Sequence, residues 1–102
     1  MTKIEYDAAI ASTEEVLVDF KADWCMPCKL LTPKLDNVLN KYPTIKLVVI
    51  NVDEVDSNIM INLGVKSIPT LIFYKNGQKI DTISGNQTEE QLSEFLDNSK
   101  KQ

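Results

Sequence analysis

The most informative segment of the chain is Trp24-Cys25-Met26-Pro27-Cys28-Lys29. It holds both cysteines of the 102-residue chain. It follows an apolar run, Val16 to Phe20, that predicts a buried β-strand, and it lies at the start of Asp23 to Lys41, where leucines recur at helical spacing. A C-x-x-C motif between a strand and a helix of an α/β chain is typical of a redox-active dithiol.

The helix start favours chemistry at Cys25. The first turn of a helix has unpaired N–H groups and the positive end of the helix dipole, and both stabilise a thiolate and lower its pKa. Pro27 fits this turn because a first-turn residue needs no intrahelical partner for its N–H. The three-residue offset lets Cys28 reach Cys25 and close a small disulfide ring.

Three other interpretations of the cysteines compete with this one. A structural zinc site needs four ligands, and two thiols without any histidine would need a dimer or an unusual carboxylate pair. A purely structural disulfide across so short a loop stabilises little and is reduced in the cytosol. Two buried, inert thiols fit poorly with an adjacent tryptophan and a proline at a helix start.

The other strands follow from short apolar runs. Lys46 to Val52 is the most hydrophobic and is expected at the centre of the sheet, covered on both faces. Thr70 to Tyr74 is another strand, and Asn76-Gly77 predicts a hairpin that returns as an antiparallel strand over Ile80 to Ser84. Strands separated by helices predict an α/β domain with a mixed sheet.

Two further helices have clear signals at their ends. Ser57 to Leu63 is followed by Gly64, a natural C-cap. Thr88 and Gln91 form a capping box at the start of the last helix. At the N-terminus, Ile4 fits a short edge strand, and Tyr6 to Ala11 fit a short helix.

Composition excludes several functions. Eleven lysines against fifteen acids give a net charge of −4, which disfavours nucleic-acid binding, and there is no arginine or histidine. Without histidine, Ser-His-Asp and Cys-His nucleophiles are excluded. The apolar run Leu47 to Ile50 is too short to cross a bilayer, and the N-terminus has no apolar signal region. We expect a cytoplasmic protein that does not bind membranes.

The chain resembles thioredoxins over nearly its whole length. The shared features, in family order, are Val18-Asp19-Phe20, the C-x-x-C stretch, Pro33, Asn51-Val52-Asp53, Ser67-Ile68-Pro69-Thr70, Asn76-Gly77 and Gly85. The resemblance implies a thioredoxin fold over a single domain, residues 1–102. Its mixed β-sheet has five strands or nearly so, flanked by about four helices.

The resemblance also implies a protein-disulfide reductase that transfers electrons by dithiol/disulfide exchange. Cys25 would be the nucleophile and Cys28 the resolving cysteine. No cofactor would be bound, because FAD and NADPH belong to the partner, thioredoxin reductase. Family substrates include ribonucleotide reductase, peroxiredoxin and methionine sulfoxide reductase. We expect the protein to act as a monomer.

Further site residues are implied in the same way. A carboxylate in an apolar strand is costly, so Asp19 is either a satisfied structural acid or, as the resemblance suggests, a buried general base with a raised pKa behind Cys28. Pro69 would be cis, leaving the backbone of Ile68 free to pair with an extended substrate. The implied apolar docking face comprises Trp24, Met26, Val65, Ile68, Pro69 and Gly85.

Three positions depart from the family pattern. Met26 replaces the usual glycine and, with Pro27, bears on the reduction potential. Lys21 replaces an aromatic residue, and Val49 replaces a frequent lysine near the buried acid. We hypothesise that Lys21, two residues from Asp19 on the same strand face, partly supplies the missing charge.

Two alternative functions use the same fold. A thiol-independent interaction module would not need the cysteines, so a thiol-dead variant and an insulin-reduction assay distinguish it from a reductase. A dithiol oxidase or isomerase usually works outside the cytosol, and its reduction potential distinguishes it.

Overall fold

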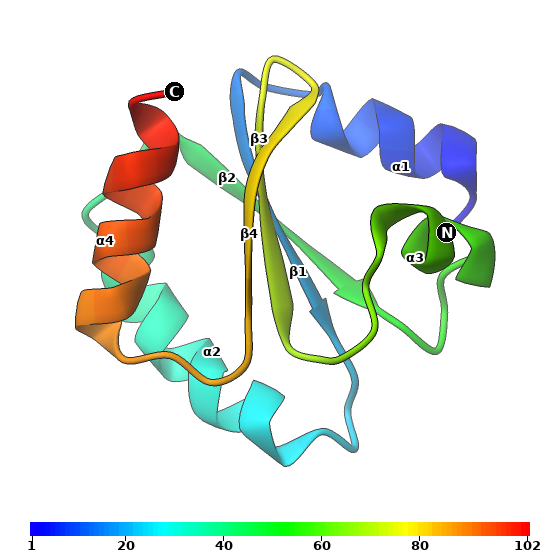
Figure 1. Ribbon diagram of the computed structural model, residues 1–102, viewed down its shortest axis with the longest axis horizontal. Helices are drawn as coiled ribbons and strands as arrows, with labels where there is room; N and C mark the ends of the chain where they lie inside the picture. The colour runs from blue at the N-terminus through cyan, green and yellow to red at the C-terminus, as the bar shows by residue number, and fades with distance from the viewer.

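Four stretches rich in β-branched and aromatic residues form one mixed sheet in the computed structural model, which describes all 102 residues (Figure 1). Helices separate most of these strands along the chain. The elements, in chain order, are α1 (Lys3–Ile10), β1 (Glu15–Lys21), α2 (Met26–Leu39), β2 (Ile45–Asn51), α3 (Ser57–Leu63), β3 (Thr70–Lys75), β4 (Gln78–Ser84) and α4 (Glu89–Lys100).

The strand order is β2-β1-β3-β4, with β1 parallel to β2 and antiparallel to β3, and β3 antiparallel to β4. The central strands are therefore β1 and β3, and both are almost wholly buried. The prediction that Lys46 to Val52 is central was wrong. This segment forms the edge strand β2, and Val49 on it is 49% exposed.

The N-terminus explains why β2 lies at the edge. Thr2 caps α1, because its hydroxyl accepts a hydrogen bond from the Glu5 N–H while the Glu5 carboxylate accepts one from the Thr2 N–H. Ile4 therefore lies on a helix and is exposed, and no strand pairs with the outer side of β2. The sheet has four strands where five or nearly five were expected.

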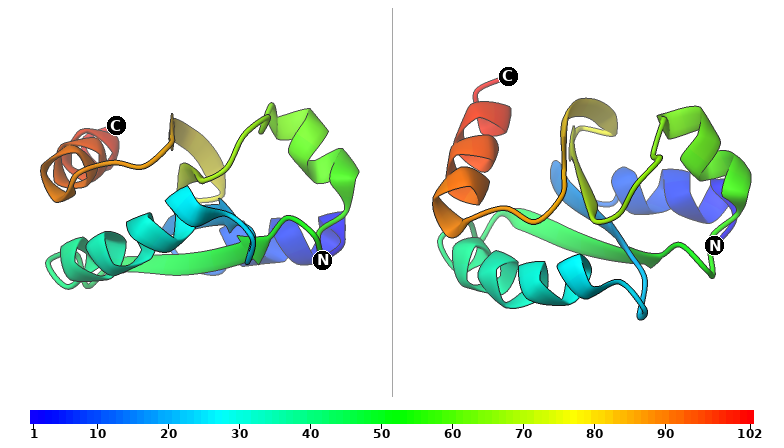
Figure 2. Two further views of the ribbon diagram at one scale, coloured as in Figure 1. Left: turned by 90° about the horizontal axis from the view of Figure 1, so that it is seen from below. Right: turned by 60° about the horizontal axis from the view of Figure 1, so that its bottom comes forward.

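The sheet separates two apolar layers, because side chains of β1 point alternately to its two faces. Leu17 packs with α2 and α4, whereas Val18 and Phe20 pack with α1 and α3. Figures 1 and 2 show these two helix pairs on opposite faces. Each fully buried side chain of this size contributes about 1.5–3 kcal/mol. The end of β1 and the start of α2 lie at one edge of the molecule (Figure 1).

Local signals predicted the remaining elements correctly. Asn76 and Gly77 take positive φ values of 53° and 79° in the β3–β4 hairpin. Gly64 ends α3 in the left-handed conformation, and the capping box at Thr88 begins α4. The longest helix, α2, has 14 residues, and no helix has the length and apolarity needed to cross a membrane.

Candidate active site

The C-x-x-C motif begins α2. Cys25 is the N-cap in an extended conformation, and its Sγ accepts a hydrogen bond from the backbone N–H of Cys28 at 3.3 Å. Pro27 lies in the first turn, as predicted. The helix begins at Met26, three residues after the predicted start at Asp23, because the chain first turns and the Cys25 N–H bonds to the Ala22 carbonyl.

A disulfide bond joins Cys25 to Cys28, with their Cα atoms 5.3 Å apart. Both residues are largely covered, with 4% of Cys25 and 3% of Cys28 exposed. They pack with Ala22 and against the side chains of Val52 and Ile68. No group of three or more Cys, Asp or Glu side chains is placed to hold a metal ion. The pair is therefore arranged for reversible opening and closing of one S–S bond.

Exposed apolar side chains flank the disulfide. Trp24 is 69% exposed and Met26 is 61% exposed. The indole Nε1 of Trp24 donates a hydrogen bond to Asp53 Oδ2 at 2.9 Å, which ties the motif to the end of β2. Asp53 was not predicted as a site residue, because no sequence pattern indicates a contact between residues 29 positions apart. This contact orients the tryptophan ring.

A hollow of about 320 Å³ lies beside Trp24. The residues that line it are Trp24, Val52, Met60, Lys66, Ser67 and Ile68. Val52, Met60 and Ser67 were not predicted as site residues.

The Ile68–Pro69 peptide bond is cis. Neither the N–H nor the carbonyl of Ile68 has a hydrogen-bond partner within the chain. The N–H can therefore donate to an added strand, and the carbonyl can accept from it.

The other predicted docking residues contribute less surface. Val65 and Pro69 are buried, and Val65 packs with the core on the α1/α3 side. Gly85 is half-buried and its N–H donates to the Pro69 carbonyl at 2.8 Å. Gly85 therefore borders the face, whereas Val65 supports it from below.

Asp19 is buried without a partner. Only 5% of the residue is exposed, and its carboxylate makes no hydrogen bond. Burial raises the pKa of Asp19 from its ordinary value of 3.8 to about 6, while Lys21 opposes this shift and Asp36 adds to it. The carboxyl thus titrates about one pH unit below neutrality, and it lacks the hydrogen-bond partners of a satisfied structural acid.

A second hollow, of about 190 Å³, lies beside Cys28 of the disulfide. Lys21, Ala22, Asp23, Cys28, Lys29 and Thr32 line it. The Lys21 ammonium lies 3.9 Å from a carboxylate oxygen of Asp23. A charged side chain from β1 therefore shares a solvent-accessible space with Cys28.

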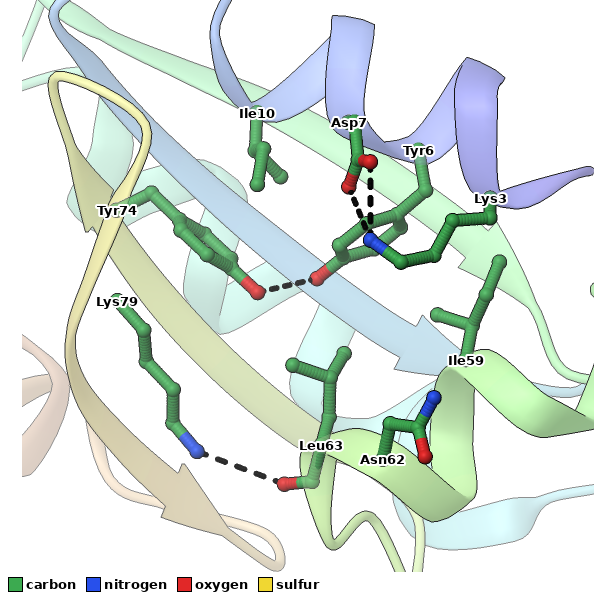
Figure 3. Close-up of a pocket in the computed structure, with 9 residues that line it drawn as sticks. All are labelled: Lys3, Tyr6, Asp7, Ile10, Ile59, Asn62, Leu63, Tyr74 and Lys79. Carbon is green, nitrogen blue, oxygen red and sulfur yellow. Dashed lines mark hydrogen bonds and ion pairs between the residues drawn. The ribbon is translucent and has the colours of Figure 1, made fainter.

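The hollow drawn in Figure 3 is remote from this chemistry. It has a volume of about 180 Å³, and residues of α1, α3, β3 and β4 line it on the face opposite α2. The hydroxyls of Tyr6 and Tyr74 point toward each other and share a hydrogen bond of 2.6 Å (Figure 3). Burial raises the pKa of both tyrosines, so they stay neutral and support the core.

Comparisons with known proteins identify the family of the chain. The family model "Thioredoxin" matches residues 1–98. Thioredoxin 1 of Synechococcus elongatus is 38% identical over 89 residues, which cover 86% of this chain and 82% of that protein. A Plasmodium falciparum thioredoxin structure is 33% identical, with a TM-score of 0.83 over 95% of this chain and 93% of that chain.

A third similar protein comes from a structure described as the basis of the thiol resolving mechanism in yeast mitochondrial 1-Cys peroxiredoxin via glutathione/thioredoxin systems. It is 29% identical, with a TM-score of 0.83, and the match covers 93% of this chain and 88% of that chain. Thioredoxins bind no cofactor and act on disulfides of other proteins through their own dithiol. This chain, with its Cys25–Cys28 disulfide at the start of α2, belongs to the thioredoxin family of protein-disulfide reductases.

Proposed function

We propose that Cys25 is the attacking cysteine and Cys28 the resolving cysteine of this reductase. In the reduced protein, the Cys25 thiolate attacks one sulfur of a substrate disulfide, and the other substrate sulfur leaves as a thiolate. Cys28 then attacks Cys25 Sγ, which forms the intramolecular disulfide and releases the second substrate thiol. Two electrons thus pass from the dithiol to the substrate. The position of Cys25 Sγ at the N-cap, hydrogen-bonded to the Cys28 N–H, is the observation that carries this assignment.

Asp19 accepts the proton that Cys28 must lose before it attacks. Three properties support this role: the residue is buried, it has no hydrogen-bond partner, and its pKa is about 6. A base with a pKa near the working pH is ionised often enough to accept a proton and weak enough to release it later. Met26 and Pro27, between the cysteines, adjust the reduction potential of the pair.

Substrates dock across the face that surrounds the disulfide. Their extended backbone pairs with the free N–H and carbonyl of Ile68 next to Pro69, which keeps the attacked disulfide in line with Cys25. Trp24 supplies exposed apolar surface, and Gly85 borders it with Val65 beneath. The hollow beside Trp24 receives a substrate side chain.

Residues 1–102 work as one domain and as a monomer in the cytoplasm. A flavin-dependent thioredoxin reductase returns the disulfide to the dithiol with electrons from NADPH. Peroxiredoxins are favoured among the substrates because one structural relative comes from work on a peroxiredoxin. Ribonucleotide reductase and methionine sulfoxide reductase are further substrates of the class that the family serves.

Trapping tests the two cysteine roles. Cys28→Ser leaves the attack intact but removes the resolving sulfur, so it should accumulate a covalent adduct between Cys25 and the substrate, seen by non-reducing electrophoresis and mass spectrometry. Cys25→Ser should form no adduct and should lose insulin reduction with dithiothreitol. Unchanged insulin reduction by Cys25→Ser would refute the assignment, whereas a lack of insulin reduction by the unaltered protein would favour a thiol-independent interaction module.

A further inference from the structure

The space beside Cys28 contains a lysine that the reaction described above does not use. We propose that Lys21 is a positioning residue for the resolving step, because it lies on the same face of β1 as the proposed base Asp19 and lines the hollow that borders Cys28. This inference rests on the proposed role of Asp19. It concerns the electrostatics of that role rather than the identity of the base.

The geometry of β1 places the two groups together. Asp19 and Lys21 are two residues apart on one strand, so their side chains leave the same face of the sheet. That face is the one covered by α2, because Leu17, two residues before Asp19, packs with Leu31 and Leu35 of α2. Lys21 then lines the hollow that it shares with Cys28.

No other cation acts on Asp19. Its neighbours on the flanking strands are Val49 of β2 and Leu71 of β3, and neither carries charge. On α2, the Asp36 carboxylate raises the pKa of Asp19, whereas Lys21 lowers it. Two other charged residues line the hollow, Asp23 and Lys29.

The Lys21 side chain is partly open to solvent. It is 32% exposed, and its nearest carboxylate oxygen, on Asp23, is 3.9 Å away, longer than a hydrogen bond. The ammonium therefore forms a loose ion pair with Asp23 and donates no hydrogen bond to it. A cation held in this way lowers the free energy of the ionised Asp19 without donating a hydrogen bond to it.

The proton transfer from Cys28 to Asp19 predicts the effect of removing the Lys21 ammonium. In the resolving step one proton leaves Cys28 Sγ and arrives at the Asp19 carboxylate. With the pKa of Asp19 at about 6, most molecules have the carboxylate ready at neutral pH. Loss of Lys21 raises this pKa, so fewer molecules can accept the proton at neutral and mildly acidic pH.

The experiment follows the resolving step as a function of pH in Lys21→Met. A chromogenic aryl disulfide forms a mixed disulfide with Cys25, and release of the second aryl thiolate reports the attack by Cys28. We expect resolution to be about two- to fivefold slower than in the unaltered protein near pH 6, with the difference disappearing above about pH 8, where Asp19 is ionised in both. NMR titration of the Asp19 carboxyl should show a higher midpoint.

Two variants test rescue. Lys21→Arg keeps the charge and should keep the pH profile of the unaltered protein. Val49→Lys, added to Lys21→Met, places a cation on the residue directly opposite Asp19 in β2 and should restore fast resolution near pH 6. Lys41→Met removes one exposed lysine whose side chain makes no hydrogen bond or ion pair, and serves as the control for net charge.

Two outcomes would overturn the proposal. An unchanged Asp19 titration in Lys21→Met would show that the ammonium does not act on the carboxyl, and equal slowing at every pH would show only a structural effect. The role of Asp19 itself is tested separately. If Asp19→Asn resolved the mixed disulfide as fast as the unaltered protein at all pH values, the proposed base would be wrong, while the titration would still report on Lys21.

Discussion

Glu15 and Asp19 are two buried acids on the same face of β1, four residues apart. Glu15 is 8% exposed and accepts hydrogen bonds from the Lys100 ammonium at 2.7 and 2.9 Å and from the Thr44 hydroxyl at 2.6 Å. Asp19 is 5% exposed and accepts none. Burial raises the pKa of both carboxyls, but Lys100 and Thr44 bring the pKa of Glu15 below its ordinary value, whereas that of Asp19 stays raised.

The pKa values of Glu15 and Asp19 differ because different helices pack against the two ends of β1. At the Glu15 end, the last turn of α4 brings Lys100 across from the far end of the chain, and this contact joins α4 to β1. At the Asp19 end, on the face of β1 that packs on α2, the carboxylate is buried and no donor reaches it. An acid with partners stabilises the fold, and an acid without them costs stability and stays available for proton transfer.

The largest effect is expected for Asp19→Asn, which should raise the free energy of unfolding by about 2–3 kcal/mol at neutral pH. The folded-state pKa of about 6 exceeds the ordinary 3.8, so ionised Asp19 destabilises the fold above pH 6. The gain should shrink as the pH falls through about 6 and disappear below 3.8. Urea unfolding of the oxidised protein across this range measures it.

The same variant should slow the resolving step at neutral pH, because the amide accepts no proton. A more stable protein with slower resolution is the combined signature of an acid kept for function. A loss of stability in Asp19→Asn at neutral pH would contradict the contrast with Glu15, since it would mean that the Asp19 carboxylate is satisfied.

A smaller effect of opposite sign is expected for Lys100→Met. It leaves the Glu15 carboxylate buried with Thr44 alone and should lower the free energy of unfolding by about 1–2 kcal/mol, a value reduced by the partial exposure of the lysine. Because the folded pKa of Glu15 is lowered, its stabilising effect exists above the ordinary value of 4.5 and is lost as the pH falls through the folded pKa. Thermal unfolding at neutral and acidic pH checks this.

Lys101→Met is the matched control, because Lys101 is exposed and its side chain makes no hydrogen bond or ion pair. It should change the stability by less than about 0.5 kcal/mol. Equal destabilisation by Lys100→Met and Lys101→Met would mean that net charge, rather than the contact with Glu15, is responsible.

A smaller effect than that of Lys100→Met is expected for Glu15→Gln. The amide keeps the shape of the side chain and the hydrogen bond from Thr44, and loses only the charge opposite Lys100, so the cost should be below about 1 kcal/mol. Insulin reduction should not change, in contrast to Asp19→Asn. Impaired reduction in Glu15→Gln with normal folding would show that both acids on this strand serve the chemistry.

Elements with local signals were predictable from the sequence. Asn76-Gly77 and the capping box at Thr88 are short patterns whose conformation depends on residues within one turn. The edge position of β2 was not predicted, since strand order depends on which segments pair over long distances. The Thr2-x-x-Glu5 pattern was a usable local signal, because it starts a helix where an edge strand was expected.

Two cysteines three residues apart, one of them at a helix N-terminus, define a reversible dithiol, and this chemistry is encoded locally in the chain. Which buried acid is satisfied and which is not depends instead on contacts between distant parts of the fold. The ammonium that binds Glu15 comes from a residue 85 positions away, and no pattern along β1 reveals its arrival there or the lack of any donor at Asp19. Carboxylates of one strand therefore differ because charge interactions act through space rather than along the chain.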